Sequence, residues 1–426
     1  MVAEVPRDIA NAIVDPKAYA DGRRIDEALH WLRCHAPLAW VEPDHYRPFW
    51  VVARHGDIQE VERHNDTFHN GDTFVTLTGI AEGNSIRTIT GGSPHLVRGL
   101  VHMDGEDHFN HRRLTQPWFM PQNMHRLEAR IRQIARQHVE RMAACGGHCD
   151  FAEDVAVHYP LAIILELIGI PAADAPLILR LIQELFGRFD AEMMRNRAQA
   201  GTEGASIAGL QATVAEFMAY FVKLSEARRK RPRNDLASLL ATASIDDQPL
   251  GQLEMLSYYI IIASCAGHST AHTIAGGLWA LLDHPGQMAS LLTEAAPIEG
   301  MIEESMRWVT PVKHFMRSAA ADAEIAGVKI AKGDWLMLSY PSGNRDDDVF
   351  AAPFSFNITR SPNRHLAFGY GAHLCLGRHL GRLEMRIFWE ELLPRLKTIE
   401  WDGVPSNVEA NFVCGPKSVP VRFTLQ

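Results

Sequence analysis

The stretch FGYGAHLCLG, residues 368–377, places a single cysteine inside a glycine-rich loop. Apolar residues recur at helical spacing from Leu376 to about Leu393, so an amphipathic helix is predicted to begin directly after the loop. Cys375 would then lie at the helix N-terminus, where free backbone N–H groups and the helix dipole stabilise negative charge. The three glycines allow tight turns and a close approach of the backbone to a bound group. The stretch therefore predicts a cysteine that acts as a thiolate ligand, the alternative being a buried, inert cysteine in a turn.

The longest helical pattern covers residues 253–282 and contains AGHST at residues 266–270. Gly267 weakens the helix at this point and leaves room beside it. The hydroxyl of Thr270 lies one helical turn after the carbonyl of Ala266 and can bond back to it, which loosens the turn. The segment thus predicts a groove for small polar molecules, although an ordinary helix with a glycine and a threonine has the same pattern.

A third signal comes from two charged residues one helical turn apart, Glu304 and Arg307. At this spacing they share a helix face and can form an ion pair. Alone, such a pair is usually a solvated surface contact of little energy. It gains weight from FNITR, residues 356–360, which supplies Arg360 shortly before the glycine-rich loop.

Together, these three segments resemble the cytochrome P450 superfamily, the haem-thiolate monooxygenases. From about residue 311 to 423 the chain resembles in particular the α-terpineol hydroxylase family of bacteria. The resemblance implies a fold that is mainly α with small β-sheets, in which a long central helix lies over a haem. It also implies one domain over residues 1–426, with a smaller β-rich corner built from the N-terminal third and residues 310–340. Helical periodicity dominates the chain, in agreement with this expectation.

The resemblance also implies which residues bind the haem. Cys375 corresponds to the ligand of the iron in haem b, with Phe368 shielding its sulfur from water and with Gly369 and Gly377 letting the loop approach the porphyrin. The two haem propionates are anions and need cationic or hydrogen-bonding partners. The residues at the corresponding family positions are His108, Arg112, Arg317 and His373. The buried structural triad of the family, which holds the loop leading to the cysteine, corresponds to Glu304, Arg307 and Arg360.

The AGHST segment resembles the oxygen-activation motif of the superfamily, usually Ala-Gly-x-(Asp/Glu)-Thr. Ala266 and Gly267 are implied as the oxygen groove, and Thr270 as the residue that stabilises bound oxygen and helps to deliver protons to it. Ser269 stands where the family usually has an acid. A hydroxyl relays a proton only by exchanging it for another, so either a chain of water molecules compensates or turnover slows and peroxide leaks. His268 is expected on another face of the helix, packed or exposed.

The composition is that of a soluble globular protein, with 46% apolar and 22% charged residues in a chain of 426. The 42 basic and 51 acidic residues give a net charge of −9, which disfavours nucleic acid as a partner. The six cysteines form no disulfide framework, as expected in a reducing compartment. The N-terminus has no signal-peptide core, and the apolar runs are too short to span a bilayer. We therefore expect a cytoplasmic protein with no membrane anchor and, by resemblance, a monomer.

By resemblance, the chain hydroxylates a small hydrophobic substrate, a monoterpenoid or an aromatic hydrocarbon, with O₂. It has no flavin or iron–sulfur motif, so electrons are expected from a [2Fe–2S] ferredoxin and its NAD(P)H-dependent reductase. Arg113, Arg378 and Arg382 are candidates for a basic patch that meets the acidic ferredoxin. Two alternatives are a peroxygenase driven by hydrogen peroxide, which Ser269 leaves open and the hydroxyl of Thr270 argues against, and a non-enzymatic haem sensor.

The substrate pocket is expected to be apolar. Its predicted lining residues are Ala263, Ala266, Val312, Phe315 and Phe412. Segments within residues 70–102 and 168–205 are expected to form its lid. Such a pocket suits a hydrocarbon or terpenoid of modest size, although ordinary core residues would give the same composition.

Overall fold

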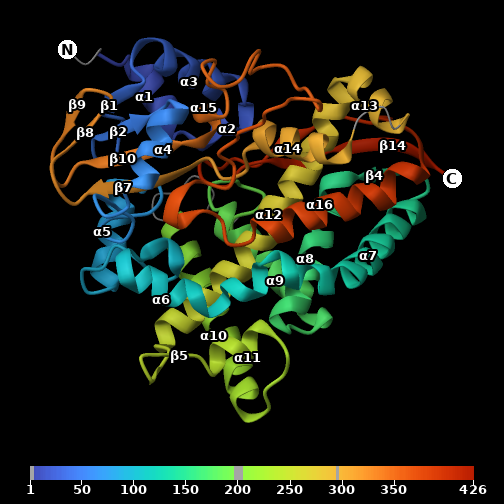
Figure 1. Ribbon diagram of the computed structural model, residues 1–426, viewed down its shortest axis with the longest axis horizontal. Coiled ribbons are helices and arrows are strands. Elements are labelled where there is room, and N and C mark those ends of the chain that lie inside the picture. Colours follow the sequence, from blue (N-terminus) through green and yellow to red (C-terminus); the bar gives the residue numbers. More distant parts are fainter. Residues whose placement is uncertain (1–3, 196–204, 294–296) are drawn as a thin grey trace.

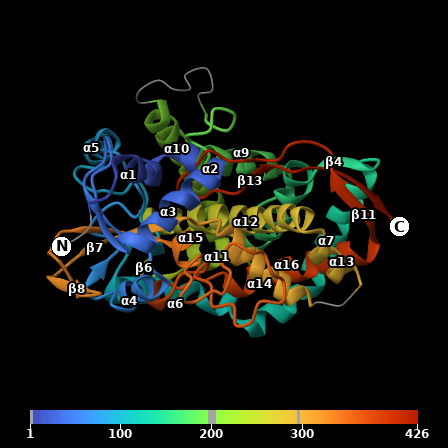
Figure 2. The same ribbon diagram turned by 90° about the horizontal axis from the view of Figure 1, so that it is seen from above.

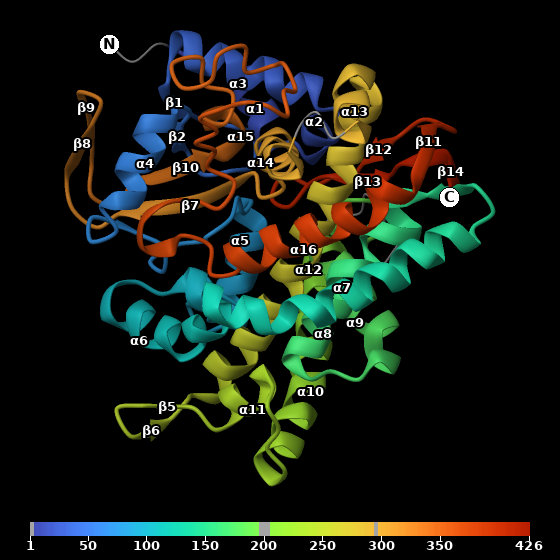
Figure 3. The same cartoon turned by 45° about the vertical axis from the view of Figure 1, so that its right-hand side comes forward.

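A long buried helix organises the molecule, whose computed structural model describes residues 4–195, 205–293 and 297–426. This helix, α12 (Gln252–Asp283), crosses the middle of the structure in each ribbon view (Figure 1, Figure 2 and Figure 3). Most of its residues are buried, as expected for a helix that is apolar on nearly every side. It forms one wall of the cavity described below.

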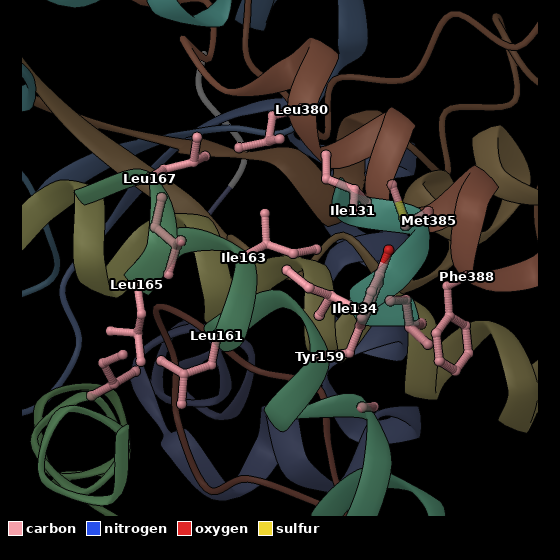
Figure 4. Close-up of a cluster of buried hydrophobic side chains, with 14 of the residues drawn as sticks. Ile131, Ile134, Tyr159, Leu161, Ile163, Leu165, Leu167, Leu380, Met385 and Phe388 are labelled. Carbon is pink, nitrogen blue, oxygen red and sulfur yellow. The ribbon is translucent and has the colours of Figure 1, made fainter. Parts of the chain in front are cut away.

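Three helices pack on one another beside α12: α7 (Pro121–Ala144), α8 (His158–Ile168) and α16 (Arg378–Leu392). Figure 4 shows the apolar cluster that they share. Its labelled members are Ile131, Ile134, Tyr159, Leu161, Ile163, Leu165, Leu167, Leu380, Met385 and Phe388. The buried Tyr159 hydroxyl donates to the Glu384 carbonyl at 2.9 Å, so it stays satisfied inside the cluster. Because each fully buried side chain of this size contributes about 1.5–3 kcal/mol, the cluster holds α16 firmly in place.

A further group of three helices packs against α12, and the first of them contributes Phe186 to the cavity. They are α9 (Ala175–Phe186), α10 (Ala205–Lys230) and α11 (Leu236–Ala241). The segment Ser206–Lys230 of α10 is the one described helix that is long and apolar enough to cross a membrane, with a mean hydropathy of 1.2. This helix also packs Phe217 and Phe221 into the core, so its apolar residues have a role in the folded protein.

A five-stranded mixed sheet forms the β-rich corner, at the upper left of Figure 1. Its strand order is β1 (Leu38–Val41), β2 (Phe49–Val52), β10 (Trp335–Ser339), β7 (His314–Ala319) and β3 (Phe68–His69). The β2–β10 pair is parallel and the other pairs are antiparallel. The sheet thus joins the N-terminal region to residues 314–339, as the sequence predicted.

The remaining helices and strands complete the helix-rich part and the β-rich corner. Helices at the N-terminus and before the cavity are α1 (Arg7–Val14), α2 (Pro16–Asp21), α3 (Arg23–His35), α4 (His55–Arg63), α5 (Ile80–Ile89) and α6 (Gly105–Thr115). Later helices are α13 (Pro285–Leu292), α14 (Ile298–Val309) and α15 (Tyr340–Gly343). Short helical turns are η1 (Leu100–His102), η2 (Gln116–Phe119), η3 (Phe151–Ala156), η4 (Ala172–Asp174), η6 (Gly371–His373) and η7 (Leu393–Arg395). A three-stranded sheet has the order β11 (Leu396–Trp401), β14 (Pro420–Leu425) and β4 (His148–Asp150). Three two-stranded sheets pair β12 (Ser406–Asn407) with β13 (Pro416–Ser418), β5 (Ser244–Ile245) with β6 (Gln248–Pro249), and β8 (Ala323–Ile325) with β9 (Val328–Ile330).

The predicted fold class, mainly α with small sheets and a long central helix, is confirmed. The helix after the cysteine begins at Arg378 instead of Leu376, because the chain is still turning at Gly377. Within the β-rich corner, residues 323–330 form a tight hairpin, in which Ala326 and Gly327 take positive φ angles between β8 and β9.

Candidate functional site

The cysteine loop is anchored to α4 by its glycines. Gly369 and Gly371 have φ angles of +68° and +65°, which side chains with a Cβ rarely adopt. A Cβ on Gly371 would lie 2.1 Å from the carbonyl oxygen of Glu62, so only glycine fits there. The backbone N–H of Cys375 donates to the Phe368 carbonyl at 2.9 Å and closes the loop. Gly377 differs, with a φ of −83° and no protein atom within 4 Å of an added Cβ, so its missing side chain leaves space in the cavity.

Burial dominates the electrostatics of Cys375. It raises the pKa of the thiol above its ordinary value, although a hydrogen bond from the Gly377 backbone and the guanidinium groups of Arg112, Arg378 and Arg382 act in the opposite direction. The helix N-terminus alone therefore does not ionise the thiol. A cation bound to the sulfur would shift the balance, because a coordinating thiol is deprotonated outright.

A cavity of about 240 Å³ lies between α12 and the cysteine loop. Most of the predicted site residues line it: Ala266, Ser269, Thr270, His108, Arg112, Arg317, His373, Phe368, Gly369, Gly377 and Cys375. The structure therefore brings together residues from four separate parts of the chain.

Gly267 has a different environment from the predicted one. A Cβ at this position would lie 3.6 Å from the Cα of Leu161, an ordinary packing distance, so this side of α12 faces α8 and not the cavity. The side of α12 that faces the cavity is formed by Cys265, Ala266 and Ser269. The expected room for a cofactor comes from this side of the helix.

One end of the cavity carries polar groups without partners. The rings of His108 and His373 stack at 4.0 Å, and the Nε2 atom of each is buried with no hydrogen-bond partner among the described residues. Burial lowers the pKa of His108 to about 4 and that of His373 to about 2, so both rings are neutral at neutral pH. Arg112 donates to the Leu374 carbonyl at 2.6 Å, and Arg317 lies 3.3 Å from a Glu62 oxygen. Two unpaired imidazoles and two guanidinium groups fit the carboxylates of a haem.

The AGHST segment forms regular helix with its hydroxyls turned to the backbone. Thr270 Oγ1 donates to the Ala266 carbonyl at 3.2 Å, as predicted, and Ser269 Oγ donates to the Cys265 carbonyl at 2.8 Å. His268 points elsewhere, as expected: it is buried, and its Nε2 lies 3.0 Å from Nε2 of His272. Burial lowers the pKa of His268 to about 4.

Two buried glutamates at the cavity were missed by the sequence reasoning. Glu384 of α16 lies near Thr270, and neither of its carboxyl oxygens has a hydrogen-bond partner among the described residues. Burial raises its pKa well above the ordinary value, and the Thr270 hydroxyl opposes this only in part. Glu62 of α4 lies at the opposite end, beside Arg317. The available signal was a glutamate one helical turn from an apolar residue, Leu380 in one case and Ile58 in the other.

The predicted buried triad is confirmed. Arg307 meets Glu304 with two hydrogen bonds of 2.8 and 2.7 Å, and the Nε of Arg360 lies 3.1 and 3.2 Å from the two carboxyl oxygens. Asn363 adds a hydrogen bond of 3.0 Å to the same carboxylate. The segment before the cysteine loop is thereby fixed to α14.

The predicted basic patch is only partly available for a partner. Arg382 forms two hydrogen bonds to Glu303, at 2.6 and 2.9 Å, and lies over the Phe368 ring. Arg378 is half-buried and lies 3.3 Å from the Cys375 carbonyl. Arg113 is exposed and makes no hydrogen bond or ion pair with the described residues.

The pocket prediction holds for four of its five residues. Ala266, Val312, Phe315 and Phe412 line the cavity, whereas Ala263 is packed in the core, because it lies on another face of α12. The lid segments contribute Asn70, Leu100, Val101 and Phe186. Residues 196–204 of the second segment lie outside the described residues.

Comparisons with known proteins agree with this site. The family model for cytochrome P450 matches residues 78–423. Cytochrome P450-terp of Pseudomonas sp is 41% identical over 423 residues, which cover 99% of each chain. Two solved structures are similar over nearly the whole chain. CYP108D1 of Novosphingobium aromaticivorans has a TM-score of 0.90 at 40% identity and covers 100% of both chains, and a P450 of Mycobacterium marinum in complex with pseudoionone has a TM-score of 0.87 at 30% identity and covers 99% of both.

Proposed function

Because the chain belongs to the cytochrome P450 family, it is a haem-dependent monooxygenase, and we propose that it hydroxylates a small hydrophobic substrate. The observation that carries this proposal is the cavity above Cys375, whose substrate-facing walls are apolar. A monoterpenoid or an aromatic hydrocarbon suits such walls. The relatives support the first class, since one is P450-terp and another is solved with pseudoionone. We further propose that residues 1–426 act as one haem-binding unit, cytoplasmic and monomeric.

The proposed haem contacts follow from the unpaired groups. Cys375 would bind the iron, while His108, His373, Arg112 and Arg317 would meet the propionates. When bound, the haem supplies the iron that activates O₂. The protein itself excludes water from the sulfur by packing Phe368 beside it and holds the loop against α4.

Aromatic side chains shape the substrate end of the cavity. Phe412 lies 5.4 Å from Phe315 and 6.2 Å from Phe186, measured between ring centroids. These three rings come from α9, β7 and the segment before β13. A rigid hydrocarbon placed among them would gain contacts without leaving a buried polar group unpaired, whereas a charged substrate would find no partner there.

Proton delivery is proposed to involve Thr270 and Glu384. Ser269 offers no charged reservoir, but Glu384 is buried near the Thr270 hydroxyl and its raised pKa keeps a proton on the carboxyl group. α16 packs close to Thr270 at this point, since a Cβ built on Gly381 would be in ordinary contact with Thr270 Oγ1, at 3.7 Å. Glu384 can therefore hold a proton one hydroxyl away from the oxygen groove.

A [2Fe–2S] ferredoxin with its NAD(P)H-dependent reductase is the proposed electron source. Arg113 is the exposed basic residue on the cysteine side that supports an electrostatic encounter. Arg382 would contribute less to docking, since its charge is already matched by Glu303.

Optical titration of the purified ferric protein with terpenes and aromatic hydrocarbons tests the proposal. A shift from low to high spin with one class would identify compounds that displace water from the iron, and product analysis with ferredoxin, reductase and NADH would follow. No shift with either class would remove both substrate proposals.

Peroxide-driven turnover is the second candidate function, because Ser269 replaces the usual acid. Turnover with hydrogen peroxide alone, compared with turnover on ferredoxin plus NADH, separates the two. Faster turnover with peroxide would favour the peroxygenase.

A further inference from the structure

Glu62 is a buried acid at the propionate end of the cavity, and it has an unsatisfied oxygen. Its side chain is about 2% exposed, and it projects from the last turn of α4. Its Oε1 accepts a hydrogen bond of 2.7 Å from the Tyr340 hydroxyl and lies 3.3 Å from Nη2 of Arg317. Its Oε2 has no partner among the described residues, although the atom is buried. The carboxyl group also lines the cavity, so a bound group can reach it.

The backbone around Glu62 fixes this carboxyl group against the cysteine loop. A Cβ on Gly369 would lie 3.3 Å from Oε1, and one on Gly371 would overlap the Glu62 carbonyl. Glu62 therefore cannot swing out to solvent without opening the contact between α4 and the loop. Glu62 therefore packs against the same loop that carries Cys375.

The charges at this end do not balance once a propionate is present. The groups in contact with Glu62 are Arg317 from β7, Tyr340 from α15 and the backbone of Tyr370 in the cysteine loop. His108, Arg112 and His373 line the same cavity. Arg317 is the cation in direct contact with Glu62, at 3.3 Å. Arg317 is equally buried, and a propionate beside it would place two carboxyl groups against one guanidinium. Two neighbouring buried carboxyl groups do not both ionise, so one of them keeps a proton.

We propose that Glu62 is a further haem-binding residue, a neutral carboxylic acid that donates a hydrogen bond from Oε2 to one haem propionate. This inference rests on the proposed propionate site formed by His108, Arg112, Arg317 and His373. Glu62 then adds a hydrogen-bond donor that the family resemblance did not include. Because Glu62 is neutral, the charge of Arg317 remains available to the propionate, and no second buried anion lacks a cation.

The protonation of Glu62 agrees with this geometry. Burial raises the pKa of Glu62 to about 7, although the charge of Arg317, the hydrogen bond from Tyr340 and a hydrogen bond from the Tyr370 backbone all lower it. An anionic propionate would raise the pKa further. Above about pH 7, haem binding therefore requires Glu62 to retain or take up a proton, and the affinity for haem weakens as the pH rises.

The test is haem transfer from the holoenzyme to excess apomyoglobin, followed from about pH 6 to about pH 9, for the native protein and Glu62→Gln. Glutamine keeps the acceptor for Tyr340 and offers a permanent N–H donor to the propionate. We expect the haem dissociation constant of the native protein, divided by that of Glu62→Gln, to rise by up to about tenfold per pH unit above pH 7. Glu60→Gln is the matched control, because Glu60 lies on the same helix but pairs with Arg63 at the surface. It should keep the native profile.

A ratio that does not change with pH would overturn the proposal, as would complete loss of haem from Glu62→Gln at every pH when the variant is folded. Should that variant fail to fold, Tyr340→Phe supplies the second test. Loss of the phenol raises the pKa of Glu62, so the native pH profile should move to higher pH, and an unmoved profile would count against the proposal. A native protein without a haem-thiolate spectrum would instead refute the proposed haem contacts themselves.

Discussion

Two groups of buried carboxylates differ in how fully they are satisfied. In the Glu304 cluster (Glu304, Arg307, Arg360 and Asn363), the carboxylate receives hydrogen bonds from all three partners and also from the backbone of Asn357. The cavity carboxyls (Glu62 and Glu384) have three of their four oxygens without any partner among the described residues. Buried polar groups are nearly always hydrogen-bonded. The Glu304 carboxylate finds all its hydrogen-bond partners within the protein, whereas the unpaired oxygens of Glu62 and Glu384 indicate that these groups hold a proton or contact a bound molecule.

The same comparison separates structure from chemistry. The Glu304 cluster lies outside the lining of the cavity and fixes the segment before the cysteine loop. Both cavity carboxyls line the space between α12 and the cysteine loop. Substituting the first group should change stability, and substituting the second should change haem binding or turnover.

Replacement of Cys375 tests the cavity side most directly. Cys375→Ala removes the proposed iron ligand, so we expect no hydroxylation and no thiolate band in the carbon monoxide difference spectrum of the reduced protein. The far-ultraviolet circular dichroism should remain native, because the Glu304 cluster is untouched. A thiolate band that survives this substitution would show that another cysteine binds the iron.

Glu304→Gln tests the complete cluster. Arg307 would remain buried beside a neutral partner, so the free energy of unfolding should fall by about 3–5 kcal/mol. Urea denaturation measures this change. Glu299→Gln on the same helix is a matched control, since Glu299 is exposed and its loss should cost roughly 1 kcal/mol or less. Equal losses in the free energy of unfolding would contradict the difference expected between the buried and the exposed glutamate.

The pH dependence of stability tests Glu62 in haem-free protein. Its pKa is raised from 4.5 to about 7 in the folded chain, so the folded state binds more protons than the unfolded state between these values. Stability should therefore fall as the pH rises from about 4.5 to about 7, by up to roughly 3 kcal/mol. In Glu62→Gln this part of the pH dependence should disappear in denaturation curves recorded across the range, and an identical slope in both proteins would count against it.

Glu384→Gln tests the proposed proton donor. Burial raises the pKa of Glu384, so glutamine should remove a cost to stability at neutral pH and the free energy of unfolding should not fall, whereas turnover should fall by about 10²-fold, near the lower end expected for a general acid. The measurement is product formed per NADH consumed, with peroxide release as a second readout. Native turnover in this variant would leave proton delivery to water and Thr270.

Arg113→Glu is expected to have the smallest effect. Electron transfer from ferredoxin at low salt should slow by roughly two- to fivefold, and the substrate-induced spin shift should be unchanged. Arg231→Glu, just beyond α10, provides a charge-matched control at another surface position. Equal rates in both variants and the native protein would remove Arg113 from the docking surface.

The sequence predicted the parts of the site that depend on local patterns. The glycine-rich loop, the length of α12 and the i, i+3 spacing of Glu304 and Arg307 all survive in the structure, because each is set by neighbouring residues. The assignments of the haem and oxygen-groove residues stay predictions, although the structure brings most of these residues to one cavity.

The errors have a common physical origin in tertiary packing. Gly267 was expected to face the cofactor but contacts α8, and Ala263 was expected in the pocket but lies in the core. The side that a helix turns to its neighbours is set by packing, which a single glycine or alanine does not reveal. Arg382 was expected to be available, but its partner Glu303 is 79 residues away in sequence. Glu62 and Glu384 look like surface glutamates until the fold buries them.

The parallel pairing of β2 with β10 has a consequence for biosynthesis. Trp50 lies beside Leu336 in this sheet, and the contact between α4 and the cysteine loop joins Glu62 to Gly371. These contacts join segments almost 300 residues apart, and pairings of such high contact order form slowly. The ribosome must therefore synthesise nearly the whole chain before the cavity at Cys375 can form. Haem would therefore be incorporated only late in synthesis. Truncated chains that end before the cysteine loop would not retain it.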